Sequence, residues 1–160
     1  IVGGAQEAFE RVEPTLLDIG PFVRRVGENG KALELKLALN ISVYLQMVGF
    51  SEGLVLAEAA GIDKQLAVDV MLNSVIASPM LQYRGPLVFG QPEEAMFDCT
   101  LMQKDVRLAL EAGRELGVPL ATLAVAGELL TVARATGVGH HDFSIVYEVL
   151  TGLAGRSQAA

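Results

Sequence analysis

Residues 31–60 read KALELKLALNISVYLQMVGFSEGLVLAEAA, and this stretch decides the fold. It is apolar on nearly every helical face and contains no proline, so it predicts one helix of about 45 Å. Such a helix is either a buried core helix or a membrane span. No aromatic belt flanks it, and it is interrupted by Lys36, Asn40, Ser42, Gln46 and Gly49. We therefore expect a helix in the middle of a bundle, wrapped by its neighbours on most sides.

The composition also favours helices. Of the 160 residues, 51% are apolar but only 6% are aromatic, and tryptophan is absent. Strands usually draw on aromatic residues and threonine, so an all-β sandwich is not expected. A chain of this length can bury one sizeable core. The sequence thus predicts an all-α fold, a multi-helix bundle around one long central helix.

Charge and cysteine content exclude some partners. The chain has 19 acidic and 12 basic residues, which gives a net charge of -7. Nucleic acids and anionic membranes attract basic surfaces, so we expect neither as a partner. The one cysteine, Cys99, cannot form an internal disulfide and leaves no zinc-finger spacing, which fits a reducing cytoplasm.

Turn residues divide the rest of the chain into short elements. Periodicity and capping signals predict helices at 5–20, 31–60, 64–73, 98–117, 120–136 and 142–153, with a short strand at 22–26. The segment 78–92 contains three prolines and two glycines and predicts one long irregular loop.

The opening residues, Ile1-Val2-Gly3-Gly4, are typical of the end of a strand that turns into a helix. Neither an initiating methionine nor a signal peptide is visible, so we expect a piece of a longer protein. We expect residues 1–27 to be the end of a linker with a short helix and strand, 28–154 a helical domain, and 155–160 a tail.

Lys36 is the unusual basic residue of the long helix. Its helical neighbours at spacings of three and four are Ala32, Leu33, Leu39, Asn40 and Val43. A lysine on such a surface either extends its amine to water or holds it in a half-buried pocket, where it could transfer protons. Asn40 follows one turn later on the same face. The residues alone leave both readings open, a solvated lysine and a catalytic pair.

The run around this pair resembles a known motif. Residues 27–40 read GENGKALELKLALN. They are similar to the G-x-x-G-x-G-x-x-x-K-x-x-x-N motif in the C-terminal domain of the β-hydroxyacid dehydrogenases, the family of 3-hydroxyisobutyrate dehydrogenase and tartronate semialdehyde reductase, related to 6-phosphogluconate dehydrogenase. Ala32 replaces the third glycine, and Leu39 replaces an asparagine that often precedes the last one.

Three further segments carry the resemblance along the chain. Residues 97–105, FDCTLMQKD, look like the family's F-x-x-x-L-x-x-K-D segment, and 117–119, GVP, like the turn that follows. Residues 137–144, GVGHHDFS, are similar to the G-x-G-x-x-D-x-S entry into the last helix. The resemblance implies the helical fold of the 6-phosphogluconate dehydrogenase C-terminal domain.

Carried over residue by residue, the resemblance implies roles for three side chains. Lys36 would be the catalytic acid and base, Asn40 would bind the substrate, and Lys104 would point toward the cofactor. Without the motif, Lys104 reads as an exposed helix lysine beside Asp105.

The resemblance also implies partners. The cofactor would be NAD or NADP, bound mainly by an N-terminal Rossmann domain that is not in this sequence, and the substrate a small hydroxy acid or semialdehyde. This fragment would not transfer hydride alone, and the protein would form a homodimer or tetramer. No metal site is expected, because the adjacent His140 and His141 have no carboxylate cluster at ligand spacing. The alternative is a helical oligomerisation or binding module without catalysis of its own.

Overall fold

The computed structural model describes residues 1–156, which form two compact units divided between Leu39 and Asn40. The division falls inside α2 (Lys31–Ala59). The predicted domain ranges 1–27, 28–154 and 155–160 stay predictions, and residues 157–160 of the predicted tail lie outside the described residues.

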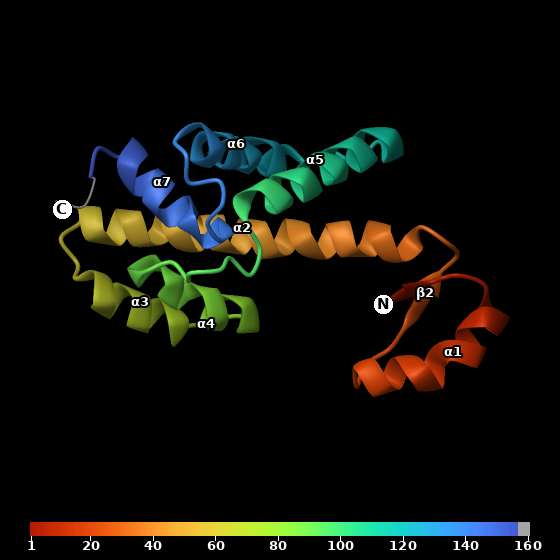
Figure 1. The fold of residues 1–160 in the computed structure, drawn as a ribbon. Coiled ribbons are helices and arrows are strands. Elements are labelled where there is room, and N and C mark those ends of the chain that lie inside the picture. Colours follow the sequence, from red (N-terminus) through yellow and green to blue (C-terminus); the bar gives the residue numbers. More distant parts are fainter. Residues whose placement is uncertain (157–160) are drawn as a thin grey trace. The chain divides into compact units, whose positions relative to one another are not determined.

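The first unit contains a small parallel β-α-β arrangement, of which Figure 1 labels α1 and β2. β1 (Val2–Gly3) pairs with β2 (Arg25–Gly27), and α1 (Gln6–Ile19) connects them. A Cβ at Gly3 would lie 2.8 Å from the backbone oxygen of Glu28, so only glycine fits where the strand meets the next turn.

The predicted strand at 22–26 is wrong in its placement. Pairing occurs only where β1 supplies backbone partners, which begins with Val2 N–H donating to the Arg24 carbonyl at 2.9 Å. Phe22 instead remains 66% exposed, with the Arg24 guanidinium 4.4 Å from its ring centroid.

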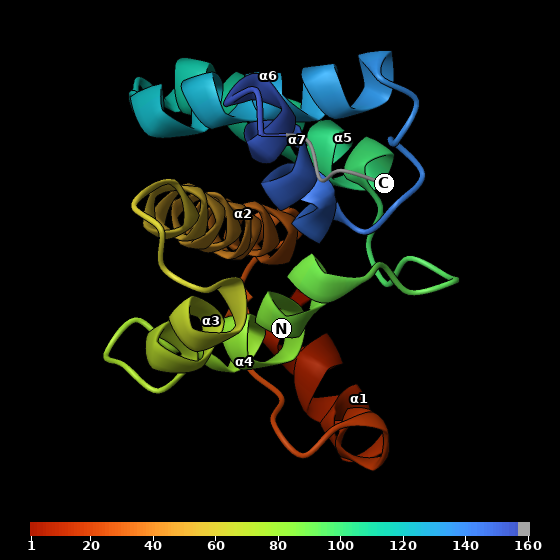
Figure 2. The same ribbon diagram turned by 90° about the vertical axis from the view of Figure 1, so that its left-hand side faces the viewer.

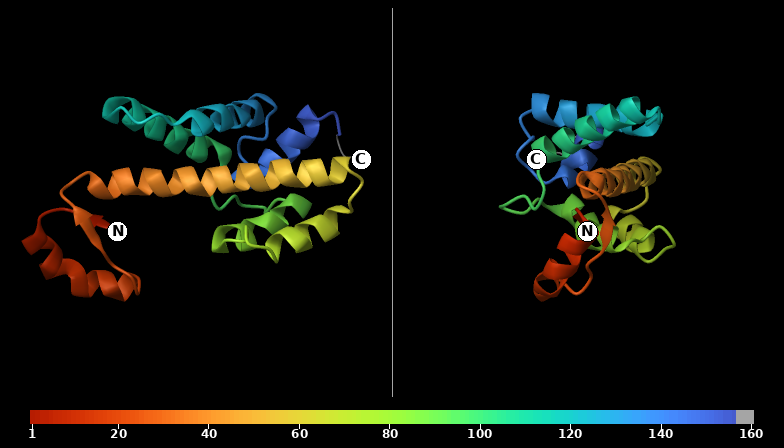
Figure 3. Two further views of the ribbon diagram at one scale, coloured as in Figure 1. Left: turned by 180° about the vertical axis from the view of Figure 1, so that it is seen from behind. Right: turned by 90° about the vertical axis from the view of Figure 1, so that its right-hand side faces the viewer.

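The second unit has two layers of helices on either side of its part of α2 (Figures 1 and 2). α5 (Cys99–Leu116), α6 (Ala121–Ala135) and α7 (Val146–Leu153) form one layer. α3 (Lys64–Leu72), α4 (Pro79–Arg84) and the 3-10 helix η1 (Gly85–Phe89) form the other. Figure 3 shows the same layers from behind. A second 3-10 helix, η2 (Phe143–Ile145), precedes α7. The all-α prediction is therefore confirmed.

Side-chain caps explain where these helices begin. Asp63, Ser78, Asp98 and Asp142 each accept a backbone N–H of the turn that follows. α5 ends at Gly117, whose φ of 68° is left-handed, and Val118 N–H donates to the Gly113 carbonyl at 2.8 Å.

The predicted irregular loop at 78–92 is wrong, because α4 and η1 occupy most of it. Pro79 and Pro86 lie in the first turns of these two helices, where a backbone N–H has no intrahelical partner. Ser78 accepts the Leu81 N–H at 3.2 Å and so begins α4. These prolines start helices and do not interrupt them.

The core of the second unit lies along one face of α2. Tyr44, Met47 and Leu54 are fully buried there, and the Tyr44 ring packs edge-on against Phe143. The expectation that α2 is wrapped on most sides is wrong for a single copy of the chain. Of its most apolar stretch 33% is buried, and Leu56 is 71% exposed. By length and composition alone α2 could cross a membrane, although its buried face is that of a core helix.

Candidate active site

Asp105 is the centre of the polar cluster that the second unit builds. It lies on the inward face of α5 with Met102, Val106 and Ala109, and it is only 1% exposed. Burying a carboxylate is costly unless other groups hold it, so its partners define the cluster.

Two of the predicted site residues hold Asp105. Asn40 Nδ2 donates to Asp105 Oδ2 at 2.6 Å, although the two residues are 65 positions apart. Lys104 Nζ lies 2.8 Å from Asp105 Oδ1, with its side chain 49% exposed. The structure therefore brings Asn40 and Lys104 to one carboxylate.

The contact between Asn40 and Asp105 is part-buried. The small void beside them is also lined by Ile41 and Leu123 and has no room for a water molecule. A charge-assisted hydrogen bond is stronger where water is excluded. Asp105 can thus fix the amide of Asn40 on one side and leave the Lys104 ammonium accessible on the other.

Sequence reasoning treated Asp105 only as the neighbour of Lys104. The signal that could have revealed it is its register, because residues 102, 105, 106 and 109 share one face of α5. A carboxylate among such residues must be paired or functional.

Lys36 lies on α2 in the first unit, where it is half-buried. α2 is helical throughout Lys31–Ala59, so Asn40 follows Lys36 at a helical spacing of four positions. The catalytic role of Lys36 stays a prediction.

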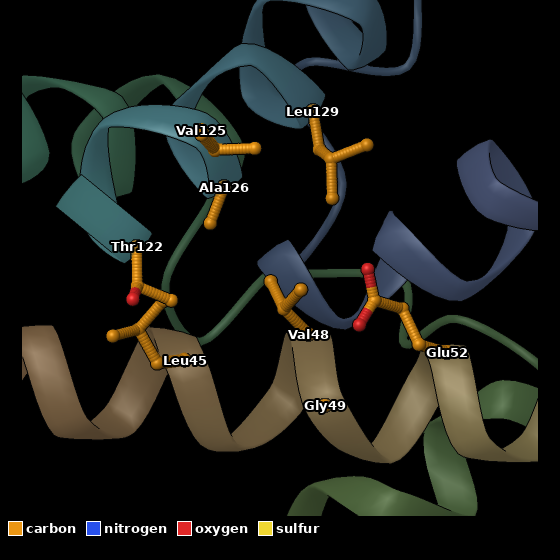
Figure 4. A pocket seen from close by; sticks show the side chains of 8 residues that line it. All are labelled: Leu45, Val48, Gly49, Glu52, Thr122, Val125, Ala126 and Leu129. Atoms are coloured by element: carbon orange, nitrogen blue, oxygen red, sulfur yellow. The ribbon is translucent and has the colours of Figure 1, made fainter.

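A separate pocket lies between α2 and α6. Its volume is about 250 Å³. Figure 4 shows apolar side chains of both helices facing each other across it, with the Glu52 carboxylate at one end. It is lined by Leu45, Val48, Gly49, Glu52, Thr122, Val125, Ala126 and Leu129. None of the predicted site residues lines it, so we do not assign the chemistry to it.

The surroundings of Cys99, His140 and His141 indicate structural roles for these side chains. Cys99 is fully buried, and burial, with the nearby carboxylates of Asp142 and Asp98, raises the pKa of its thiol to about 12. Within residues 1–156 there is no group of three or more histidine, cysteine or acidic residues that could hold a metal ion. The rings of His140 and His141 instead lie 4.2 Å apart.

Comparisons with known proteins extend over most of the chain. Residues 30–150 match a family model described as "NAD-binding of NADP-dependent 3-hydroxyisobutyrate dehydrogenase". Glyoxylate/succinic semialdehyde reductase 1 of Arabidopsis thaliana is 32% identical over 94% of this chain and 52% of its own length. The 2-hydroxy-3-oxopropionate reductase of Escherichia coli is 30% identical over 99% of this chain and 54% of its own length.

A solved structure has the same fold. The crystal structure of 3-hydroxyisobutyrate dehydrogenase from Salmonella typhimurium superimposes with a TM-score of 0.83 at 24% identity, covering 92% of this chain and 52% of that one. The chain spans about half the length of the curated relatives it matches.

Proposed function

This chain belongs to the 3-hydroxyisobutyrate dehydrogenase family of β-hydroxyacid dehydrogenases, and on that premise we propose that it is the helical C-terminal part of an NAD(P)-dependent oxidoreductase. The substrate would be a small hydroxy acid or its semialdehyde. NAD or NADP is the cofactor of the family, as the matched family model describes. The observation that carries the proposal is the convergence of Asn40 and Lys104 on the buried Asp105.

Lys36 is the proposed acid and base. In oxidation its neutral amine accepts the proton of the substrate hydroxyl, and in reduction its ammonium returns a proton to the carbonyl oxygen. The nicotinamide, when bound, accepts or supplies the hydride. A lysine suits this task because its amine is a compact group on a flexible stem.

Asn40 and Lys104 are the proposed binding residues. Asp105 accepts from Asn40 Nδ2, which fixes the amide and orients its carbonyl oxygen toward a substrate hydroxyl as an acceptor. Lys104 fits an anionic cofactor, because its half-exposed ammonium is held by Asp105 on one side and keeps donors for a phosphate or ribose oxygen on the other.

We further propose that a nucleotide-binding Rossmann domain forms the other half of the full-length protein. The relatives are about twice as long as this chain, and parallel strands such as β1 and β2 normally belong to larger, covered sheets. Residues 1–27 would then lead from that domain, and the chain alone would not transfer hydride. The enzyme would work in the cytoplasm.

The test of this function is Lys36→Ala in the full-length protein, assayed with small hydroxy acids and their semialdehydes. We expect turnover to fall by about 10²-fold or more, since general acid and base catalysis contributes that much, while cofactor binding is retained. Lys31→Ala is the matched control, because Lys31 is an exposed lysine on the same helix that pairs with Glu34 at 2.7 Å. Near-normal turnover of Lys36→Ala would remove Lys36 from the mechanism.

A second function, self-association, is favoured by a separate observation. An apolar groove of about 550 Å³ lies between α2 and α3, and its lining includes Ile62, Leu66 and Val70, which are each about half exposed. We propose that a second copy of the chain covers this surface in a homodimer or tetramer. Light scattering with and without NADPH and a hydroxy acid distinguishes a catalytic unit from a module that only associates.

A further inference from the structure

A buried ion pair outside the candidate site joins α4 to the start of η2 in the second unit. Asp142, the residue that begins η2, is fully buried, and the side chain of Arg84 from α4 is 14% exposed. Arg84 Nε donates to Asp142 Oδ1 at 3.3 Å, and Arg84 Nη2 approaches Oδ2 at 3.5 Å.

The same carboxylate also holds the segment that leads into α5. Phe97 N–H donates to Asp142 Oδ2 at 3.2 Å, and Ser144 N–H donates to Oδ1 at 3.1 Å. A short antiparallel bridge reinforces the contact, with Phe143 N–H donating to the Phe97 carbonyl at 3.0 Å. The next residue, Asp98, caps α5 by accepting the Leu101 N–H at 2.7 Å.

Aromatic packing connects this junction to α2. The Arg84 guanidinium carbon lies 4.7 Å from the centroid of the Phe143 ring. Phe143 packs edge-on against Tyr44, with centroids 6.2 Å apart, and Tyr44 follows Asn40 by one turn of α2. The junction therefore contacts both helices that supply the cluster, next to Asn40 on α2 and before Lys104 on α5.

Stability alone is a weak reason for such a pair. Removing two charges from water costs as much as their attraction returns, so an apolar pair of similar volume would stabilise the fold equally well. What an apolar pair cannot do is accept two backbone N–H groups and a guanidinium at fixed angles. The chemistry of Asp142 thus specifies a geometry.

We propose that Asp142, held by Arg84, is a positioning residue that sets where α5 lies along α2 and so places Lys104 and Asp105 against Asn40. This inference rests on the proposed function for its effect on turnover. Its structural part, the fixed register of α5, stands independently.

The experiment compares Asp142→Asn, Arg84→Met and the double variant in the full-length enzyme. We expect each to lower kcat about tenfold, because displacements well under 1 Å are costly at a reaction centre. The double variant separates the two roles, since it leaves no unpaired charge. Positioning predicts that it recovers thermal stability while kcat stays low, and a merely structural pair predicts that kcat recovers with stability.

Hydrogen exchange on the 160-residue chain gives a readout that needs no turnover. In Asp142→Asn the amides of residues 102–106 in α5 should exchange faster relative to those of residues 130–133 in α6. Val149→Ala is the control, because Val149 is buried in α7 and its truncation weakens packing without touching Asp142. The control should accelerate both helices alike.

Two results would overturn the proposal: α5 and α6 amides accelerating together in Asp142→Asn, or a double variant with wild-type kcat. If the wild-type enzyme turns over no hydroxy acid, the proposed function fails, and the exchange ratio still decides whether Asp142 positions α5.

Discussion

Asp105 shows how a single buried charge organises its neighbours. The carboxylate is 1% exposed and receives the Asn40 amide at 2.6 Å and the Lys104 ammonium at 2.8 Å. Because the Asn40 contact is part-buried and the Lys104 side chain is 49% exposed, the two contacts should differ in energy. A hydrogen bond to a buried charge contributes about 1.5 to 3 kcal/mol, whereas an exposed ion pair contributes less than about 1 kcal/mol.

The first prediction compares these contacts by urea denaturation of the chain. Asp105→Asn keeps the volume of the side chain but removes its charge, and should lower the free energy of unfolding by about 2 kcal/mol. Lys104→Met should lower it by less than about 1 kcal/mol, because water already screens its ammonium. Equal losses in the two variants would contradict the assignment of Asp105 as the buried centre.

The second residue-scale prediction concerns the thiol of Cys99. Its pKa is raised to about 12, so at pH 8 almost none of it is the reactive thiolate. The native chain should therefore resist alkylation by iodoacetamide at pH 8, and mass spectrometry should find one alkyl group per chain after unfolding in urea. Rapid labelling of the native chain would show that the thiol is accessible.

At the scale of elements, the sequence predicted α3, α5, α6 and α7 within a few residues and failed at α4 and η1. The apolar run of α2 and the Asp98 and Gly117 boundaries of α5 are strong local signals. Segment 78–92 was misread because proline interrupts a helix in its interior but is compatible with its first turn. Which of the two applies depends on the Ser78 cap and on packing against neighbours distant in sequence.

The candidate site could also be predicted from the sequence only in part. The family resemblance suggested Asn40 and Lys104 as candidate site residues, and their roles stay predictions. The contact of Asn40 with Asp105 bridges 65 positions and depends on how α5 packs against α2. The pattern of residues along either helix does not show how the two helices pack against each other. The partial exposure of α2 was missed for the same reason, because an apolar side chain has the same local pattern whether its own chain or another one covers it.

The element-scale prediction tests the cap of α4. Ser78→Ala removes the acceptor of the Leu81 N–H and should lower the free energy of unfolding by about 1 kcal/mol, while Ser78→Thr should retain most of the stability. Ser74→Ala is the control, because Ser74 follows α3 and caps no helix start, so its loss should stay below about 0.5 kcal/mol. Thermal and urea unfolding measure the stability of the Ser78 variants and of the Ser74→Ala control. If Ser78→Ala has no effect, α4 does not depend on this cap.

At the scale of the whole molecule, the second unit leaves several large apolar side chains exposed to solvent. Leu56 on α2 is 71% exposed, and Leu66 and Val70 on α3 are 55% and 58% exposed. Large contiguous apolar patches on a protein surface usually mark an interaction site. A second copy of the chain fits, since the net charge of -7 has little effect at a patch without charged groups in its lining.

The last prediction tests this surface with one charge. Leu66→Lys places an ammonium in the groove between α2 and α3, where association would have to desolvate it, so the dissociation constant should rise at least about tenfold. Leu116→Lys is the matched control, because Leu116 is 68% exposed at the end of α5 and does not line the groove. Light scattering over a concentration series should therefore show the wild type and Leu116→Lys as dimers or larger and Leu66→Lys shifted toward monomer. A monomeric wild type would refute self-association, and equal shifts in both variants would place the contact elsewhere.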